Sequence, residues 1–172
     1  MRETGLLQVD VEYDFLRARR HHVLAALAHR LRSRRGAGNR LVPLDEVADP
    51  ASWRGQLQLG RQTIRLDTII GTAEPRRDFD WRFRPTSDRV RFRWERLALA
   101  QRRGEPIPPI EVYRVGGSHF VIDGHHRISI AAAAGEQLIE ANVTQVLTGV
   151  PSRSGRSPVH EDRPTRAVVC CA

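Results

Sequence analysis

Hydrophobic residues near the N-terminus recur every three or four positions, which is the period of an amphipathic helix. The pattern predicts a helix over about residues 14–35, and the glycine-containing stretch 36–39 ends it. Arginine and histidine side chains fill the opposite face of this predicted helix. We expect the hydrophobic face to pack inward, and it consists of Leu16, Val23, Leu24, Leu27 and Leu31.

The next part of the chain has a less regular pattern. Residues 40–62 are interrupted by prolines and glycines, so we expect an irregular segment with a short helical turn near residues 45–47. The composition of residues 63–70 is typical of a β-strand. A long loop over residues 71–85 follows, and its three aromatic side chains indicate that it is ordered.

The most regular pattern lies between residues 86 and 147. It predicts a helix capped by Thr86 or Ser87 and ended by Gly104, two strands joined by a glycine turn, a buried helix and a last strand. The predicted ranges are 87–103, 110–115, 119–122, 125–134 and 139–146. This order predicts an α+β fold, a small mixed sheet with packed helices, preceded by the N-terminal amphipathic helix.

Three segments follow from these elements. We predict an N-terminal helix and irregular segment over residues 1–59, one α+β domain over residues 60–150, and a disordered tail over residues 151–172, which is rich in Ser, Arg, Pro and Gly. No stretch holds the roughly 20 apolar residues of a membrane helix, and no apolar run follows the N-terminus. We therefore expect a cytoplasmic protein without a membrane partner. Cys170 and Cys171 are adjacent, which does not favour a disulfide or a zinc site.

The sequence has a formal net charge of +8, and all 28 of its basic residues are arginine. Two interpretations are open. A GC-rich genome favours arginine codons and would explain the missing lysine without any partner. A polyanion partner would explain the net charge, because the planar guanidinium group pairs well with phosphate. The charge therefore keeps DNA as a candidate partner.

The candidate chemistry gathers at Asp123-Gly124-His125-His126-Arg127, where a predicted strand ends and a buried helix begins. The first N–H groups of a helix have no partner within it, and the helix dipole favours an anion there. Gly124 has no Cβ, which would let a phosphate approach the backbone, and the next three side chains can donate hydrogen bonds. Asp123 could cap the helix, contact a metal ion or act as a base. The alternative is an ordinary capped helix start with exposed polar residues.

Three runs around this turn resemble the N-terminal domain of ParB, a member of the ParB/sulfiredoxin superfamily. The runs are 108–113, 120–127 and 131–135, and the resemblance extends over about residues 60–147. It implies the fold of that superfamily and a site at the turn. It does not imply one activity, because the superfamily includes centromere-binding CTPases, sulfinic-acid reductases, free-serine kinases and proteins described as nucleases.

Residues at the turn separate these activities. Sulfiredoxins carry Gly-Cys-His-Arg, and His125 stands where their reactive cysteine would be, so the resemblance does not support sulfiredoxin activity. Partition ParB proteins carry Gly-Glu-Arg-Arg, which Gly124 and Arg127 match and the two histidines do not. Because those proteins also need further domains, we do not expect a complete partition protein. The Asp-Gly-His-His-Arg form is similar to the free-serine kinases, in which a glutamate soon after the first strand is the base. Glu74 lies in about that place.

The resemblance also implies roles for the loop over residues 71–85. In ParB-like domains this loop approaches the nucleotide, which implies that Arg84 contacts phosphate. Asp78 and Asp80 could hold Mg²⁺, because this ion binds carboxylate and phosphate oxygens together. Phe79 or Trp81 could stack on a base, or could anchor the loop in the core.

The leading hypothesis is a ParB-like domain that binds a nucleoside di- or triphosphate with Mg²⁺ at the turn. The sequence leaves open whether the protein is also an enzyme, an NTPase or a phosphotransferase. The residues assigned to phosphate binding are Gly124, His125, His126, Arg127 and Arg84, those assigned to catalysis are Asp123, His125 and Glu74, and those assigned to the metal are Asp78 and Asp80. One alternative is a DNA-binding accessory or nuclease-like protein without nucleotide chemistry. Another is a protein that docks on a partner protein through its N-terminal helix.

Overall fold

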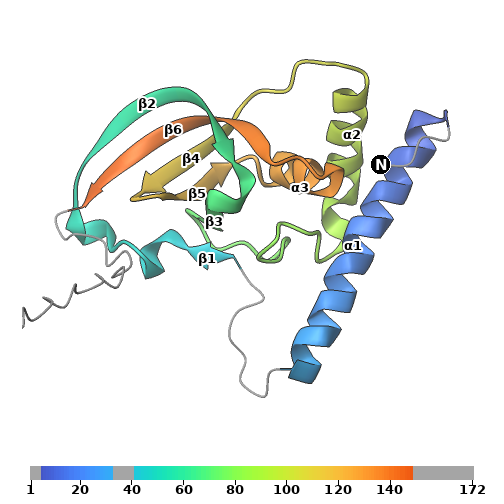
Figure 1. Ribbon diagram of the computed structural model, residues 1–172, viewed down its shortest axis with the longest axis horizontal. Coiled ribbons are helices and arrows are strands. Elements are labelled where there is room, and N and C mark those ends of the chain that lie inside the picture. Colours follow the sequence, from blue (N-terminus) through green and yellow to red (C-terminus); the bar gives the residue numbers. More distant parts are fainter. Residues whose placement is uncertain (1–4, 33–40, 149–172) are drawn as a thin grey trace, which may run out of the picture.

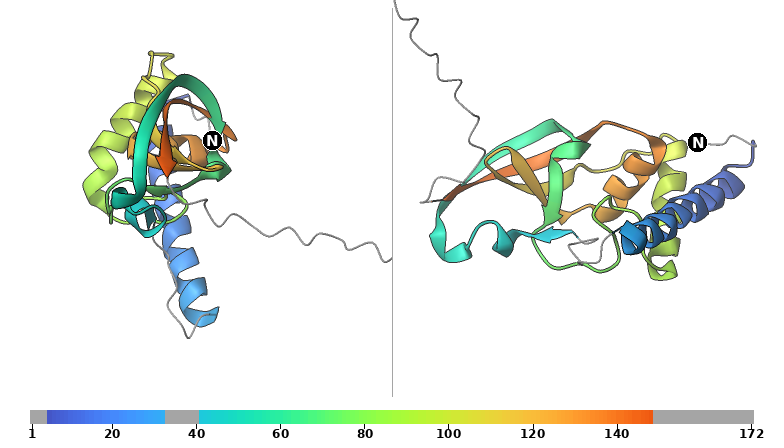
Figure 2. Two further views of the ribbon diagram at one scale, coloured as in Figure 1. Left: turned by 90° about the vertical axis from the view of Figure 1, so that its left-hand side faces the viewer. Right: turned by 60° about the horizontal axis from the view of Figure 1, so that its bottom comes forward.

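The computed structural model describes residues 5–32 and 41–148, in which three helices lie at one end of a six-stranded sheet (Figures 1 and 2). The helices are α1 (Leu7–Arg32), α2 (Arg91–Arg102) and α3 (His125–Ala134). The strands are β1 (Val42–Pro43), β2 (Trp53–Arg65), β3 (Ile69–Thr72), β4 (Ile110–Val115), β5 (Ser118–Asp123) and β6 (Leu138–Thr148). The predicted α+β class is confirmed. In the described part of the chain no helix has the length and apolar character needed to cross a membrane.

The sheet is mixed and has the order β1-β3-β5-β4-β6-β2. Strands β4 and β5 form the predicted hairpin, and Val115 pairs with Ser118 across the glycine turn. Strand β6 runs parallel to β4, and β3 runs parallel to β5. The order places the end of β5 and the start of α3 in the interior of the fold, next to β3 and β4.

Strand β2 was not predicted. Residues 53–62 were expected to be irregular, yet they pair antiparallel with β6, and the pairing shifts register next to Gly55 and Gly60. Such bulges interrupt the two-residue alternation by which a strand is recognised. The single strand predicted over residues 63–70 is two strands, because the 3₁₀ turn Leu66–Thr68 separates β2 from β3. Strand β2 also runs across the predicted boundary between residues 59 and 60.

Helix α1 packs against α2 through a narrow face with Val11, Phe15 and Ala18 buried. The ring of Phe15 meets the ring of Trp94 edge-on, with 5.6 Å between the ring centres. The same face also buries Asp10 and Asp14. Asp14 forms an ion pair with Arg102 on α2, so its carboxylate has a partner inside the interface.

The predicted inner face of α1 is therefore wrong. Leu16, Val23, Leu24 and Leu27 are exposed, and the side chain of Leu31 lies outside the described residues. The helix also begins at Leu7, a full turn or more before the predicted start near residue 14. Both errors have one cause. The two aspartates make the truly buried face look polar in the sequence, while the opposite face carries more large hydrophobic side chains.

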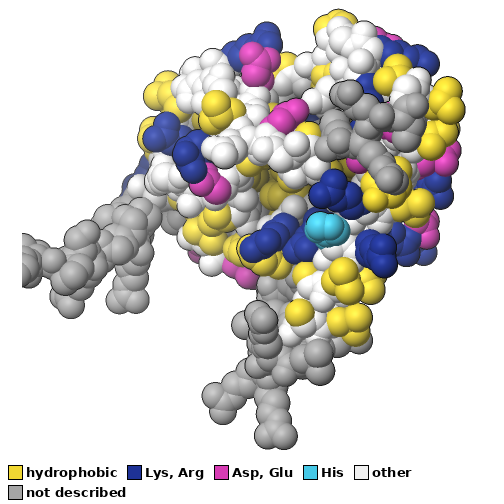
Figure 3. Space-filling view, turned by 45° about the vertical axis from the view of Figure 1, so that its right-hand side comes forward, with side chains coloured by type: hydrophobic (Ala, Val, Ile, Leu, Met, Phe, Trp, Pro, Cys, Tyr) yellow, Lys and Arg dark blue, Asp and Glu magenta, His cyan; other side chains and the backbone are white. Residues whose placement is uncertain are grey.

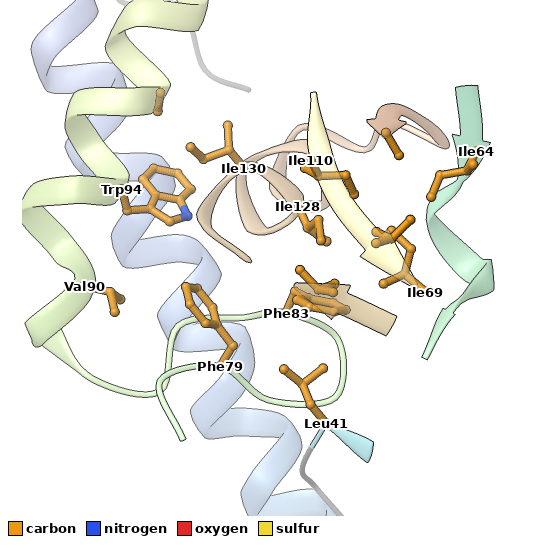
Figure 4. Packing of buried hydrophobic residues seen from close by; sticks show 14 of the residues in the cluster. Leu41, Ile64, Ile69, Phe79, Phe83, Val90, Trp94, Ile110, Ile128 and Ile130 are labelled. Carbon is orange, nitrogen blue, oxygen red and sulfur yellow. The ribbon is translucent and has the colours of Figure 1, made fainter. Parts of the chain in front are cut away.

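The loop over residues 71–85 contributes side chains to the main core. Phe79 and Phe83 are both 4% exposed, and Figure 4 shows them pointing from the loop into the cluster that holds Ile110 and Ile128. Trp81 is exposed instead, and the guanidinium of Arg82 lies 4.4 Å from its ring centre. The loop aromatics were expected either to stack on a base or to anchor the loop. Phe79 anchors the loop in the core.

Helices α2 and α3 are joined through the core. The fully buried Trp94 donates a hydrogen bond from its indole Nε1 to Ser129 Oγ at 3.0 Å. A short 3₁₀ turn, Asp88–Val90, precedes α2, so this helix begins a few residues later than predicted. Helix α3 spans the residues predicted for it, and the contact between Trp94 and Ser129 joins its second turn to α2.

Candidate functional site

The residues of the predicted turn lie where β5 ends and α3 begins. Gly124 is the N-cap residue, and the first helical hydrogen bond runs from Ile128 N–H to Gly124 O at 3.0 Å. The N–H groups of residues 125–127 precede that bond, so they have no acceptor within the helix. Asp123 does not cap the helix through its side chain, contrary to one of its predicted roles. The turn thus offers backbone donors and the positive end of a helix dipole.

Gly124 is required by its packing on β4. Its φ is +110°, a region that side-chain-bearing residues rarely adopt, and an added Cβ would lie 2.5 Å from Ile110 Cγ2. The sequence interpretation was that this glycine lets a phosphate approach the backbone. The structure gives a different reason, because the space that a Cβ would fill is already filled by Ile110.

His125 is buried and fixed by hydrogen bonds. Thr72 donates its hydroxyl hydrogen to Val121 O at 3.2 Å, so Thr72 Oγ1 accepts from His125 Nε2–H at 2.9 Å. This network assigns the proton to Nε2 and leaves Nδ1 as an acceptor. The ring stacks on Phe79 with 6.1 Å between the ring centres. Burial, assisted by the charge of Arg76, lowers the pKa of His125 to about 4.

His126 is held edge-on to the ring of Phe79, with 5.2 Å between the ring centres. Its Nε2 atom is buried and has no hydrogen-bond partner among the described residues. Burial and the charge of Arg93 lower the pKa of His126 to about 4. Both histidines are therefore neutral near pH 7, and they offer hydrogen-bonding atoms without a positive charge.

A small hollow of about 70 Å³ opens in front of these two histidines. Its charged lining consists of Arg76 and Asp78 from the loop, Arg93 from α2, and Asp123 and Arg127 from the turn. The sequence analysis did not single out Arg76 and Arg93.

Arg127 lines the hollow, but its guanidinium is already engaged. Nη1 donates to Pro108 O at 2.6 Å and to Pro109 O, and Nη2 pairs with Asp123. These bonds tie the first turn of α3 to the segment that leads into β4. Arg127 thus holds the turn in place, and phosphate binding by this residue stays a prediction.

Two other predicted residues lie elsewhere. The fully buried carboxylate of Asp80 accepts hydrogen bonds from the backbone N–H groups of Arg82 and Arg84, both at 2.9 Å. It also lies 3.0 Å from His22 Nδ1 on α1 and 3.1 Å from Arg84 Nε. Arg84 in turn donates to His21 O at 2.8 Å. Asp80 and Arg84 thus anchor the loop to α1 and do not line the hollow, where they had been expected to meet a metal ion and a phosphate.

Glu74 is exposed and does not line the hollow either, although it was predicted as a base. Within the part of the chain that the structure describes, no three His, Cys, Asp or Glu side chains gather closely enough to hold a metal ion by themselves. The carboxylates that do line the hollow are Asp78 and Asp123. A metal ion there would need oxygen ligands from a bound phosphate as well.

The neutral state of His125 predicts a stability that depends on pH. The pKa falls from 6.5 to about 4 on folding, so the unfolded chain binds the extra proton between these values. The stability that neutral His125 contributes is complete above pH 6.5 and is lost as the pH falls toward 4. At about pH 5 the loss is about 2 kcal/mol, at about 1.4 kcal/mol per pKa unit.

Urea unfolding at about pH 7.5 and about pH 5 measures this loss. We expect His125→Gln to lose about 2 kcal/mol less than the wild type between the two conditions. His21→Gln, at an exposed histidine on α1, serves as the control and should behave like the wild type. An equal loss in His125→Gln and the wild type would contradict the prediction.

The comparisons with known proteins are few. No protein-family model matches the sequence, and no curated protein sequence matches it. Among solved structures, the chain is similar to the crystal structure of sulfiredoxin from Arabidopsis thaliana. The two share 22% sequence identity over 48% of this chain and 82% of that chain, with a TM-score of 0.36. This similarity covers about half of the chain and assigns no activity to it.

Proposed function

We propose that the protein is a ParB/sulfiredoxin-like domain that binds the phosphate group of a nucleotide in the hollow at the start of α3. The observation that carries this proposal is the Nε2 atom of His126, which is buried at the hollow without a partner among the described residues. A buried polar atom of this kind costs free energy unless a ligand or a water molecule satisfies it. A phosphate oxygen would accept a hydrogen bond from His126 Nε2–H and from the backbone donors of the turn.

Charge around the hollow also favours an anion. Arg76 and Arg93 line it from two different elements, and within the described residues neither forms an ion pair. The pKa values of the two histidines are lowered mainly by burial and further by the charges of Arg76 and Arg93. Guanidinium groups placed on two sides of one point suit a tetrahedral anion.

The size of the hollow limits what it encloses. Pockets that enclose a whole drug-sized ligand have roughly 300–1,000 Å³, and this hollow has about 70 Å³. It therefore admits a phosphate-sized group, while the nucleoside lies outside against the exposed surface. Asp78 and Asp123 fit a Mg²⁺ ion shared with that phosphate, because Mg²⁺ is usually held by one or two carboxylates together with phosphate oxygens. Whether hydrolysis or phosphoryl transfer follows binding is a separate question, which phosphate release in the presence of Mg²⁺ would answer.

Isothermal titration with nucleoside di- and triphosphates and with pyrophosphate, each with Mg²⁺, tests the proposal. We expect Arg76→Ala and Arg93→Ala to weaken binding by about 10-fold to 100-fold each, since a hydrogen bond to a charged group contributes about 1.5–3 kcal/mol. The matched control is Arg96→Ala, which removes an exposed arginine from the same helix without touching the hollow. Absence of binding by the wild type, or equal effects of Arg93→Ala and Arg96→Ala, would contradict the proposal.

Duplex DNA is the second candidate ligand, and a separate cluster of basic side chains favours it. Arg17 and His21 on α1 line a hollow of about 420 Å³ together with Arg82 and Arg84 from the loop. Figure 3 shows arginine side chains gathered around a histidine on the side of the molecule where α1 lies. DNA bound there would lose affinity steeply with added salt. Arg17→Ala would weaken it and Arg93→Ala would not, so the two candidate ligands are distinguishable.

A further inference from the structure

Helix α1 carries a second hydrophobic face, on the side that points away from α2. Together with Leu6, which directly precedes the helix, its members are between 44% and 65% exposed, and they are Val9, Tyr13, Leu16, Val23 and Leu27. We call this set the outer stripe. The residues that α1 buries against α2, such as Phe15 and Ala18, lie on the opposite side of the helix.

The outer stripe has the spacing of a coiled coil. Steps of three and four residues alternate along the series 6, 9, 13, 16, 20, 23 and 27. Every position in this series is hydrophobic except position 20, which is Arg20. This is the alternation of a and d positions in a heptad repeat, through which two helices pack side by side. A continuous exposed face of this kind on a monomer is typical of a protein–protein contact.

We propose that the outer stripe pairs with the outer stripe of a second copy of this chain, so that two α1 helices form an antiparallel coiled coil. A second copy is favoured because it brings the same heptad spacing and the same length of exposed helix. From Val9 to Leu27 the stripe runs along about five turns of α1, which is about 27 Å at 1.5 Å per residue. Pairing also leaves the contact between α1 and α2 intact, because that contact uses the opposite face.

Charge selects the antiparallel direction. In a parallel pair Arg20 would face Arg20 of the second copy inside the stripe, and like charges at such a position destabilise a coiled coil. In an antiparallel pair centred midway between Leu6 and Leu27, Arg20 lies level with Tyr13 of the second copy and one residue from Glu12, whose carboxylate also lies 3.7 Å from Arg91 Nη2 of its own chain. Arg20 can then stack on the tyrosine ring and attract the carboxylate.

Sedimentation equilibrium of the full chain across the micromolar range tests the pairing. We expect a mass of twice the single-chain value of 19.5 kDa for the wild type. Leu16→Glu and Val23→Glu, made separately, should each give the single-chain mass, because a carboxylate would be buried in the middle of the stripe. The matched control is Leu57→Glu on β2, where the leucine is 54% exposed compared with 52% for Leu16.

Circular dichroism of each variant checks that the fold is retained, and because Leu16 and Val23 are exposed we expect it to be. A dimer abolished by Leu16→Glu or by Val23→Glu but kept in Leu57→Glu supports the proposal. A wild type that stays monomeric across the whole concentration range overturns the proposal. This holds even if the outer stripe binds a different protein. A dimer that persists in both stripe variants overturns it as well.

Disulfide crosslinking tests the direction in a background with Cys170→Ser and Cys171→Ser. A mixture of the Val9→Cys and Val23→Cys proteins should crosslink to each other, because these positions lie within one residue of level in the antiparallel pair. Neither protein alone should crosslink to itself. Self-crosslinking of Val9→Cys would overturn the antiparallel arrangement.

Discussion

Replacing Gly124 with alanine is expected to lower the free energy of unfolding by about 3 kcal/mol or more. Two costs add at this position. A φ of +110° strains a residue that has a Cβ, at about 1–3 kcal/mol. The new methyl group would also lie 2.5 Å from Ile110 Cγ2, and forcing extra volume into a packed core costs about 1–3 kcal/mol. Urea or thermal unfolding measures the difference.

Two other glycines separate these costs. Gly60 has a φ of +74° with open space around it, so Gly60→Ala keeps the strain and removes the clash, with an expected loss of about 1 kcal/mol. Gly117 has neither feature, and Gly117→Ala should leave stability close to that of the wild type. A loss at Gly124 no larger than the loss at Gly60 would show that contact with Ile110 is not the reason for the glycine.

Replacing Asp80 with alanine is expected to cost about 3 kcal/mol of stability. The buried carboxylate accepts the backbone N–H groups of Arg82 and Arg84 and is close to His22 and to the guanidinium of Arg84. Removing one partner of a buried ionic network leaves the others without a counterpart, which costs about 3–5 kcal/mol in comparable sites. We expect the lower end of this energy range, because the side chains of His22 and Arg84 are each 17% exposed and water can reach them.

Chemical denaturation of three variants tests this assignment. Asp80→Asn keeps an oxygen for the two backbone N–H groups and loses the charge, so we expect a loss smaller than that of Asp80→Ala. Asp67→Ala is the control, because Asp67 pairs with Arg65 on the surface and its removal should not measurably change stability. If Asp80→Ala is as stable as the wild type, the carboxylate does not anchor the loop, and a role elsewhere must be sought for it.

Local signals predicted the second half of the fold well. The glycine turn at residues 116–117, the break at Gly124 and the helix that follows depend on neighbours in the sequence, and each lies where it was expected. Strand β2 and the inner face of α1 depend on distant partners. β2 is held by β6, which is more than 70 residues away, and Asp14 is acceptable inside only because Arg102 reaches it from α2.

The sequence predicted where the turn lies but not which side chains surround it. The sequence located the turn and both histidines, which line the hollow. It also assigned phosphate contacts to Arg127 and Arg84, each of which donates to a backbone oxygen and lies against a carboxylate, Asp123 for Arg127 and Asp80 for Arg84. Tertiary geometry decides which guanidinium groups form hydrogen bonds and ion pairs within the protein and which point into the hollow without such a partner among the described residues. In a chain with 28 arginines, residue type alone cannot distinguish Arg76 and Arg93 from the others.

Phe79 belongs to two parts of the molecule at once. It packs in the main core and it also forms the wall on which His125 and His126 rest. A change at this position would therefore alter folding and the shape of the hollow together, so an evolving lineage could rarely accept one. Under the proposed function, a change of ligand is easier to reach at the rim, through Arg76, Asp78 and Arg93, because these side chains line the hollow and do not belong to the core.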